Sequence, residues 1–290
     1  MVLNPLLYQQ DAQFAQCEAL FWAADTASIK TAQLSLDPGA NINGQRNRYP
    51  YSGTPVFQAV QQRCRIGKPG HPEPTPELIE IYDHFIRFLI SRGADLNLTT
   101  SPLHNFCLFL ACRSYPNLAV FRMLLENGAD PNLLGGVTGG TVIHELAHLL
   151  AAADPNQPNE FLEMLRLSLE YGGDPNARDE HLAMPLHIAT NFWQPDREDG
   201  GSAVVERVQL LLEYGADVNA RNYRRQLPLK LVVYSASPLH EELVKILVKN
   251  GADTSRCRLP ERGENRDKLL RICDKILEST GIKCEFISVD

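Results

Sequence analysis

The stretch LLLEYGADVNARN, residues 210–222, joins an apolar segment to a turn, and its central part recurs along the chain. The recurring five residues read GANIN from Gly39, GADLN from Gly93, GADPN from Gly128, GGDPN from Gly172, GADVN from Gly215 and GADTS from Gly251. Successive glycines lie between 35 residues (Gly93 to Gly128) and 54 residues (Gly39 to Gly93) apart. Such self-similarity indicates a repeat protein with a unit of about 33 residues that carries insertions.

Two helices are predicted for each unit. The residues seven, five, four and three positions before each glycine are nearly all apolar or small, which predicts a helix with one broad buried face that ends at the glycine. A second helix start follows most of the glycines and reads TPVFQA at Thr54, SPLHNF at Ser101, TVIHELA at Thr141, MPLHIA at Met184 and LPLKLV at Leu227. Threonine or serine can cap such a helix, and proline in its first turn loses no hydrogen bond.

The helix starts and the GADVN turns together resemble the ankyrin repeat, from about residue 18 to residue 255. The resemblance implies an all-α solenoid in which antiparallel helix pairs, joined by hairpin-like fingers, stack into a curved array. We expect one solenoid over residues 1–262, with units at about residues 11–50, 51–100, 101–138, 139–182, 183–225 and 226–262. The first unit, with helices in ALFWAAD and TASIKTAQLSL, should act as a cap. The segment ENRDKLLRICDKILEST, within residues 263–290, has apolar residues at helical spacing and predicts a capping helix and tail.

The units differ from the standard repeat in length. About 20 residues separate the helix start from the closing glycine in a standard unit, but here the distance reaches 38 residues, from Pro55 to Gly93. We expect the added length to lie between the two helices of a unit, in polar loops at residues 64–76, 152–159 and 193–201. These loops are either tolerated surface length or a second contact surface of an adaptor. Only nine residues join Gly93 to Pro102, so that finger should lack its tip.

The composition disfavours several classes of protein. Hydrophobic residues make up 44% and charged residues 22% of the 290 residues, as in ordinary globular proteins. The chain shows no signal-peptide pattern and no run of about 18 apolar residues, so we expect neither secretion by that route nor a membrane partner. A net charge of -7 disfavours nucleic acid as a partner. Seven cysteines without a CxxC pair predict reduced thiols in the cytoplasm.

The segment HELAH, residues 144–148, matches the HExxH pattern of zinc proteases. Its histidines would bind zinc from one helical face, and Glu145 would act as the general base. However, His144 occupies the same place in its unit as His104 and His187. The resemblance to ankyrin repeats therefore implies that His144 forms local hydrogen bonds at the helix start.

The surroundings of HELAH also lack a clear third zinc ligand. Alanines occupy residues 151–153, where the metzincin pattern has glycine and histidine, and Glu163 or Glu170 would have to act from the second helix of the unit. We therefore expect no catalytic residue, no metal and no cofactor, with a zinc-dependent hydrolase as the alternative. No phosphate-binding glycine-rich loop occurs.

A binding module is the favoured function. Solenoids offer extended concave surfaces to partner proteins, and aromatic and arginine side chains contribute most of the energy at such interfaces. The candidate partner-binding residues in the fingers and loops are Arg46, Arg48, Tyr49, Tyr51, His181, Trp193, Tyr223, Arg224 and Arg225. Basic fingers on an acidic protein indicate an acidic target segment.

Irregular units with inserted loops and no accompanying domain are also similar to ankyrin proteins that intracellular bacteria deliver into host cells. We expect a monomeric cytoplasmic protein that acts as an adaptor or as a delivered effector, in the latter case in the host cytoplasm.

Overall fold

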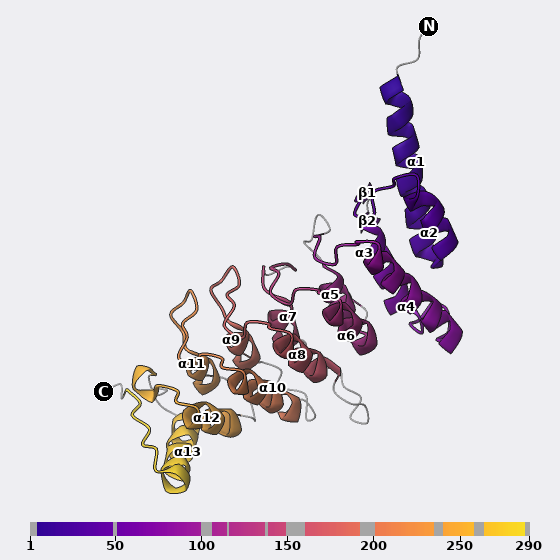
Figure 1. Ribbon diagram of the computed structural model, residues 1–290. Coiled ribbons are helices and arrows are strands. Elements are labelled where there is room, and N and C mark those ends of the chain that lie inside the picture. Colours follow the sequence, from indigo (N-terminus) through magenta and orange to yellow (C-terminus); the bar gives the residue numbers. More distant parts are fainter. Residues whose placement is uncertain are drawn as a thin grey trace. The chain divides into compact units, whose positions relative to one another are not determined.

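The computed structural model describes residues 5–48, 51–99, 106–114, 116–136, 139–148, 160–191, 201–234, 240–257 and 264–287. The chain divides into two compact units, Met1–Val137 and Thr138–Asp290 (Figure 1). This division falls between the third and fourth predicted repeats. A single solenoid over residues 1–262 and the exact repeat boundaries stay predictions.

The described part of the first unit contains three helix pairs. They are α1 (Pro5–Thr26) with α2 (Ile29–Leu36), α3 (Pro55–Arg65) with α4 (Pro76–Ser91), and α5 (Cys107–Phe109), continued by the π-helical turn η1 (Leu110–Ser114), with α6 (Leu118–Glu126). The first helices of successive pairs also pack on one another, α1 on α3 and α3 on α5. Helix α1 begins at Pro5, so it is much longer than the predicted segment ALFWAAD.

The described part of the second unit also contains three helix pairs. They are α7 (Val142–His148) with α8 (Glu160–Glu170), α9 (Pro185–Thr190) with α10 (Gly201–Glu213), and α11 (Pro228–Val233) with α12 (His240–Lys249). The first helices form one layer and the second helices another (Figure 1). The predicted capping helix is confirmed as α13 (Glu264–Thr280), which packs on α12.

The core follows the repeated apolar pattern. The residues seven and four positions before each glycine are buried in all six cases. The burial of the residue five positions before the glycine varies more. Leu34, for example, is 66% exposed on α2, the second helix of the first pair. In α13, Leu269, Ile272 and Ile276 are buried, whereas Leu270 and Leu277 are exposed. Helix α13 therefore buries only the side that faces its neighbours.

The helix starts predicted at Thr54, Thr141, Met184 and Leu227 are confirmed by the first residues of α3, α7, α9 and α11. The Thr54 hydroxyl accepts a hydrogen bond from the Phe57 N–H (3.3 Å), and Pro55 occupies the first position of α3. Prolines also begin α9 and α11. Capping by a side-chain oxygen satisfies an N–H group that has no partner within the helix.

Each repeated glycine ends its helix in a left-handed conformation. At Gly215, φ is 86°, the glycine N–H donates to the Leu212 carbonyl (3.0 Å), and the Ala216 N–H donates to the Leu211 carbonyl (2.9 Å). This pair of bonds is the Schellman arrangement, which satisfies the last carbonyls of a helix. The same two bonds occur at the glycines at positions 39, 93, 128, 172 and 251. A side chain at these positions would be strained, which explains the invariance of glycine along the chain.

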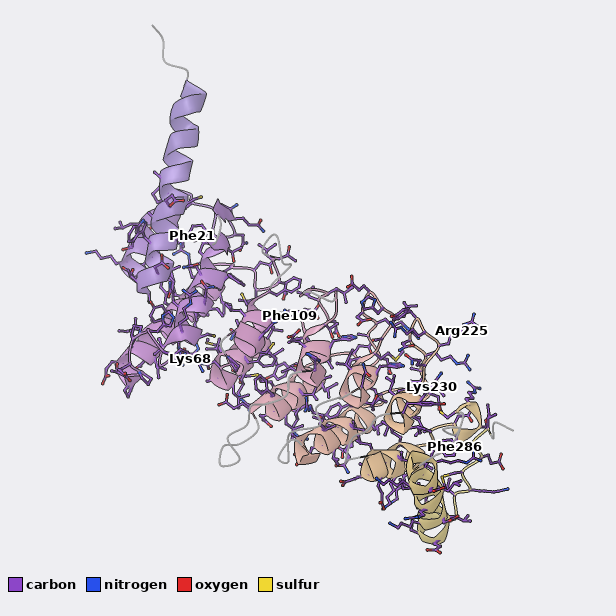
Figure 2. The ribbon with its side chains drawn as sticks, turned by 180° about the vertical axis from the view of Figure 1, so that it is seen from behind. Phe21, Lys68, Phe109, Arg225, Lys230 and Phe286 are labelled. Atoms are coloured by element: carbon purple, nitrogen blue, oxygen red, sulfur yellow. The ribbon has the colours of Figure 1, made fainter. Side chains whose placement is uncertain are left out.

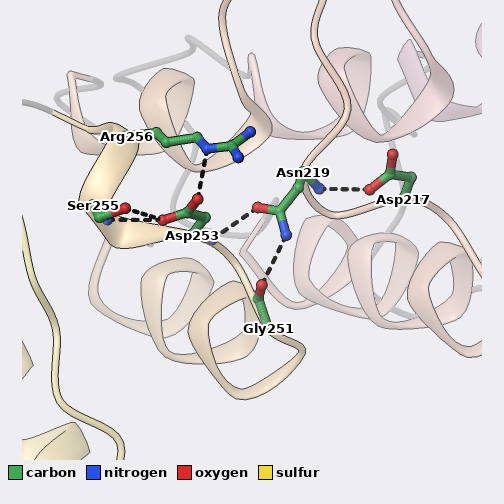
Figure 3. Close-up of polar contacts among 6 residues, drawn as sticks. All are labelled: Asp217, Asn219, Gly251, Asp253, Ser255 and Arg256. Atoms are coloured by element: carbon green, nitrogen blue, oxygen red, sulfur yellow. Dashed lines mark hydrogen bonds and ion pairs between the residues drawn. The ribbon is translucent and has the colours of Figure 1, made fainter.

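Within each compact unit, asparagines join one such turn to the next, as the close-up of Asn219 shows (Figure 3). The Asn219 amide donates to the Gly251 carbonyl (2.9 Å), and its side-chain oxygen accepts from the Asp253 N–H (2.8 Å). Equivalent bonds run from Asn43 to Gly93 and Asp95, from Asn97 to Gly128 and Asp130, and from Asn176 to Gly215 and Asp217. We call this series the asparagine ladder.

The last turn of the series has no ladder residue. Serine replaces asparagine at position 255, and its hydroxyl and N–H both bond to the Asp253 carboxylate (2.5 and 3.1 Å). The Arg256 guanidinium also contacts that carboxylate (2.6 Å, Figure 3). The change from GADVN to GADTS therefore marks the end of the ladder.

The first finger is a β-hairpin, as the hairpin-like prediction requires. Strand β1 (Arg46–Arg48) pairs in antiparallel register with β2 (Tyr51–Gly53), with Arg48 opposite Tyr51. The predicted short finger after Gly93 and the helix start at Ser101 lie partly outside the described residues.

The inserted loops separate paired helices in most units. Residues 66–75 lie between α3 and α4, where the Gly67 N–H donates to the Pro72 carbonyl (2.7 Å). Residues 149–159 and 192–200, which separate the next two insertion-bearing pairs, are outside the described part. In the third pair only residues 115–117 separate the helices, and α5 begins as late as Cys107. The prediction that all added length lies between the helices is therefore wrong for this pair.

We predict that Asn219→Ala lowers the free energy of unfolding by about 1–3 kcal/mol, because it removes two hydrogen bonds between successive turns and leaves a carbonyl and an N–H group without these partners. Urea unfolding followed by circular dichroism measures the change. Asn250→Ala is the matched control, because Asn250 makes a bond only to Ile246 within its own helix region (2.8 Å). Equal losses in the two variants would contradict a stabilising role for the ladder.

Candidate functional site

Two neighbouring fingers of the second unit, residues 178–183 and 221–226, have the same backbone structure. In the first, the Asp179 carboxylate accepts from the N–H groups of His181 and Ala183 (both 2.8 Å). In the second, the Asn222 amide oxygen accepts from the N–H groups of Arg224 (3.0 Å) and Gln226 (2.9 Å). These bonds inside each finger hold its tip in one conformation.

Each finger tip contains a residue in the left-handed region. Leu182 has φ 52° and Arg225 has φ 56°. This conformation costs roughly 1–2 kcal/mol for a residue with a Cβ. Leu182 is also 49% exposed. The tips therefore place side chains in solvent at positions where glycine would be the more stable choice.

The two fingers are joined to each other. The Tyr223 N–H donates to the His181 carbonyl (3.1 Å). The Arg178 guanidinium donates to the carbonyls of Leu182 (3.3 Å) and Arg221 (3.1 Å), and so connects the two hairpins. The fingers form a single supported surface.

Aromatic and cationic side chains gather on this surface. The His181 and Tyr223 rings have centroids 5.4 Å apart, and Arg224 Cζ lies 5.1 Å from the Tyr223 ring centroid. Arg225 follows on the same tip and points away from the helices (Figure 2). Glu180 lies beside His181, with 3.8 Å between Glu180 Oε1 and His181 Nε2, and its carboxylate reduces the local positive charge. We name His181, Tyr223, Arg224 and Arg225 the finger-tip cluster.

The other predicted binding residues lie elsewhere. Arg46, Arg48 and Tyr51 belong to the β1–β2 hairpin of the first compact unit, where the backbone alone is described. Tyr49 and Trp193 lie outside the described residues. The structure thus brings together four of the nine predicted residues.

Sequence reasoning missed two participants in this surface, Leu182 and Arg178. Leu182 could have been identified from the sequence, because it is an apolar residue within a predicted finger. The contacts of Arg178 with two fingers become evident only in three dimensions.

The HELAH segment forms most of α7, and His144 is occupied by structural hydrogen bonds. The His144 side chain is only 4% exposed, and its Nδ1 accepts from the Thr141 N–H (3.0 Å). Its Nε2 lies 3.1 Å from the Ala183 carbonyl, which requires Nε2 to carry the proton. The expectation that His144 forms local hydrogen bonds is confirmed. Neither nitrogen has a free lone pair for zinc in this arrangement.

His187 has the same role one repeat later. Its Nδ1 accepts from the Met184 N–H (3.2 Å), and its Nε2 contacts the carbonyls of Ala220 (3.2 Å) and Gln226 (3.0 Å). Each histidine thus links a helix start to the finger of the next repeat. Within the described part of the chain, no group of three or more histidine, cysteine or acidic residues could hold a metal ion.

Burial lowers the pKa of both histidines below the ordinary value of 6.5, because desolvation penalises the charged ring. The carbonyls of Ala183 and Gln226 oppose this shift. Both rings are therefore neutral in the folded protein at neutral pH.

The cysteines of the third pair pack as small apolar residues. Cys107 and Cys112 are buried, and burial raises the pKa of the Cys107 thiol to about 12. Such a thiol is a poor nucleophile.

Buried Arg207 shows how α10 supports α7. Its guanidinium donates to the carbonyls of Ala147 (3.2 Å) and Leu146 (3.5 Å) at the end of α7, and burial lowers its pKa to about 10. A cation that bonds to the last carbonyls stabilises a helix end. A side chain of α10 thus stabilises the last described turn of α7.

Comparison with known families agrees with this architecture. The family model described as "Ankyrin repeat" matches residues 102–135 and 183–223, the second of which includes α9, α10 and part of the second finger. No curated protein matches the sequence significantly. In the described part of the chain, no helix is both long and apolar enough to cross a bilayer.

These observations define an all-α repeat protein of the kind that provides surfaces for protein–protein interaction. The chain carries ankyrin repeats at residues 102–135 and 183–223. Ankyrin repeats bind other proteins and are generally not enzymes. The family model matches two places, so the count of six repeats stays a prediction.

We predict that Leu182→Gly raises the free energy of unfolding by up to about 1 kcal/mol, because glycine adopts a positive φ without strain, although its unfolded state has more freedom. Thermal unfolding measures the shift. Leu134→Gly is the control at another exposed leucine, one without a positive φ, and it should destabilise. A loss of stability in Leu182→Gly would contradict the strain at this finger tip.

We predict that acidification destabilises the fold in the range where unfolded histidine gains a proton. Since the folded pKa values of His144 and His187 are lowered, the unfolded chain binds more protons below about pH 6.5, and stability falls as the pH falls. One pH unit below that value removes at most about 1.4 kcal/mol for each histidine.

Urea unfolding between pH 7.5 and pH 5.5 measures this dependence, and His187→Gln should make it shallower. His148→Gln, at the exposed end of α7, is the control. An unchanged slope in His187→Gln would show that His187 is not the titrating group.

Proposed function

We propose that the protein captures an extended acidic segment of a partner protein on the finger-tip cluster. The observation that carries this proposal is the aromatic–cationic arrangement of His181, Tyr223 and Arg224 on two joined fingers. Tyrosine and arginine are enriched among the residues that dominate binding energy at interfaces. All three side chains are exposed and available to a partner.

Preorganisation supports this surface as a binding site. The Asp179 and Asn222 side chains fix the two tips, and the Arg178 guanidinium holds them together. A partner that binds a surface already held in shape loses less conformational entropy on association. The strained φ values of Leu182 and Arg225 are consistent with side chains retained at the tips for contact.

Charge supports an acidic partner. The whole chain has a net charge of -7, yet the second finger carries Arg221, Arg224 and Arg225 within five residues. A local basic surface on an acidic protein favours encounter with carboxylates and disfavours other orientations. Binding should therefore weaken as the salt concentration rises.

A cytoplasmic location, in a host cell if the protein is delivered by a bacterium, forms part of the proposal. All seven cysteines are free thiols, which suits a reducing compartment. An adaptor role, in which the inserted loops contact a second protein, is compatible with the separation of the loop at residues 66–75 from the finger-tip cluster in sequence.

To test this proposal, peptides that bind the purified protein are selected from a random display library. We predict enrichment of aspartate and glutamate, and an at least tenfold weaker binding of the selected peptides to the double variant Arg224→Glu, Arg225→Glu. Tenfold corresponds to about 1.4 kcal/mol, which the loss of two favourable charge contacts and their reversal readily supplies.

The matched control is Lys249→Glu with Arg271→Glu, which makes the same change in net charge on exposed residues of α12 and α13. Circular dichroism establishes that both double variants fold. Peptides without acidic enrichment, or equal weakening by both double variants, would contradict the proposal.

A further inference from the structure

The C-terminal tail returns from the end of α13 to the edge of the last helix pair. The chain turns at Gly281, where φ is 74°, and the tail runs back beside α13 (Figure 1). The Glu285 N–H then donates to the Thr254 hydroxyl (2.8 Å), and the Ile287 N–H donates to the Cys257 carbonyl (3.0 Å). The tail thus lies against residues 254–257, beyond the last bonds of the asparagine ladder, which Asn219 makes.

This return places two cysteines side by side. Cys273 lies seven residues before the end of α13, a distance of about 10 Å along a helix axis. Cys284 lies four residues beyond that end, about 13 Å along an extended chain. The two therefore lie at the same height along the axis of α13, and their thiol side chains are in hydrogen-bonding contact with each other.

The other five cysteines differ from this pair. Cys64, Cys107, Cys112 and Cys257 are buried, and Cys17 belongs to the other compact unit. Cys273 and Cys284 are both partly exposed. Among the seven thiols, these two combine mutual contact with access to solvent.

We propose that Cys273 and Cys284 form a redox-sensitive dithiol whose oxidation to a disulfide fixes the C-terminal tail on α13 and on the edge formed by residues 254–257. The site accepts small disulfide oxidants, such as oxidised glutathione.

The reaction proceeds by two exchanges. The Cys284 thiolate attacks one sulfur of oxidised glutathione, which breaks the glutathione disulfide, forms a mixed disulfide and releases one glutathione thiolate. The Cys273 thiolate then attacks the Cys284 sulfur and releases the second glutathione thiolate. Both released thiolates take up the protons lost by the cysteines, so two protein thiols are oxidised and one oxidised glutathione is reduced to two thiols.

The environment makes this reaction slow at neutral pH. Burial, with the Cys284 sulfur nearby, raises the pKa of Cys273 to about 12, and burial also raises the pKa of Cys284. Since the thiolate is the nucleophile, oxidation accelerates as the pH rises. The pair is therefore expected to stay reduced until an oxidant accumulates.

The experiment treats the reduced full chain with oxidised glutathione at about pH 8.5, blocks the remaining thiols and maps tryptic peptides without reduction. We expect a disulfide between ICDK, residues 272–275, and CEFISVD, residues 284–290, with a mass lower by two hydrogen atoms. The melting temperature should rise by several degrees, because the bond restricts the conformational freedom of the unfolded chain. Hydrogen exchange of the Glu285 and Ile287 amides should slow.

Cys284→Ser should abolish the cross-link and both stability effects, whereas Cys17→Ser should retain them. The test does not depend on whether the variants fold, because the cross-link and the slower amide exchange are measured in the unaltered chain. Glutathione adducts without the cross-link, a different cysteine pairing, or unchanged exchange of the tail amides on cross-linking would overturn the proposal.

Discussion

Each compact unit depends on how one helix pair is attached to the next within it. A pair of short helices cannot bury its apolar face alone, so a repeat protein is stable only through contacts between neighbours. Here the contacts are directional as well as apolar. The left-handed glycine turns the chain out of the helix, and the following asparagine binds the backbone of the next turn with both ends of its amide, as Asn219 does with Gly251 and Asp253.

Hydrogen bonds between neighbouring repeats also hold the fingers and support the candidate binding surface. Histidines at the helix starts reach the backbone of the next finger, as His187 reaches Ala220 and Gln226, so the fingers are held at their bases as well as at their tips. The finger-tip cluster therefore lies on fingers that hydrogen bonds hold at both ends. Its side chains remain exposed because Asp179, Asn222 and Arg178, and not the residues of the cluster, hold the tips in place.

Much of the fold could be predicted from the sequence because glycine, proline and the apolar spacing act locally. Helix ends at Gly215 and helix starts at Pro55 need only a few neighbouring residues to be recognised. The length of α1, the late start of α5 and the exposure of Leu270 could not be predicted, since they depend on which neighbours are present.

The types of residue at the site could be predicted from the sequence, but their spatial arrangement could not. Aromatic and arginine residues in the fingers were visible in the sequence, whereas the contact between Tyr223 and His181, and that between Cys273 and Cys284, required the tertiary structure. Native-state hydrogen exchange at the Asp253 N–H is the sharpest test of the asparagine ladder. We expect slow exchange there in the unaltered chain and fast exchange in Asn219→Ala, with the Asp217 N–H still protected by Asn176. Equal exchange of the Asp253 N–H in both proteins would contradict this expectation.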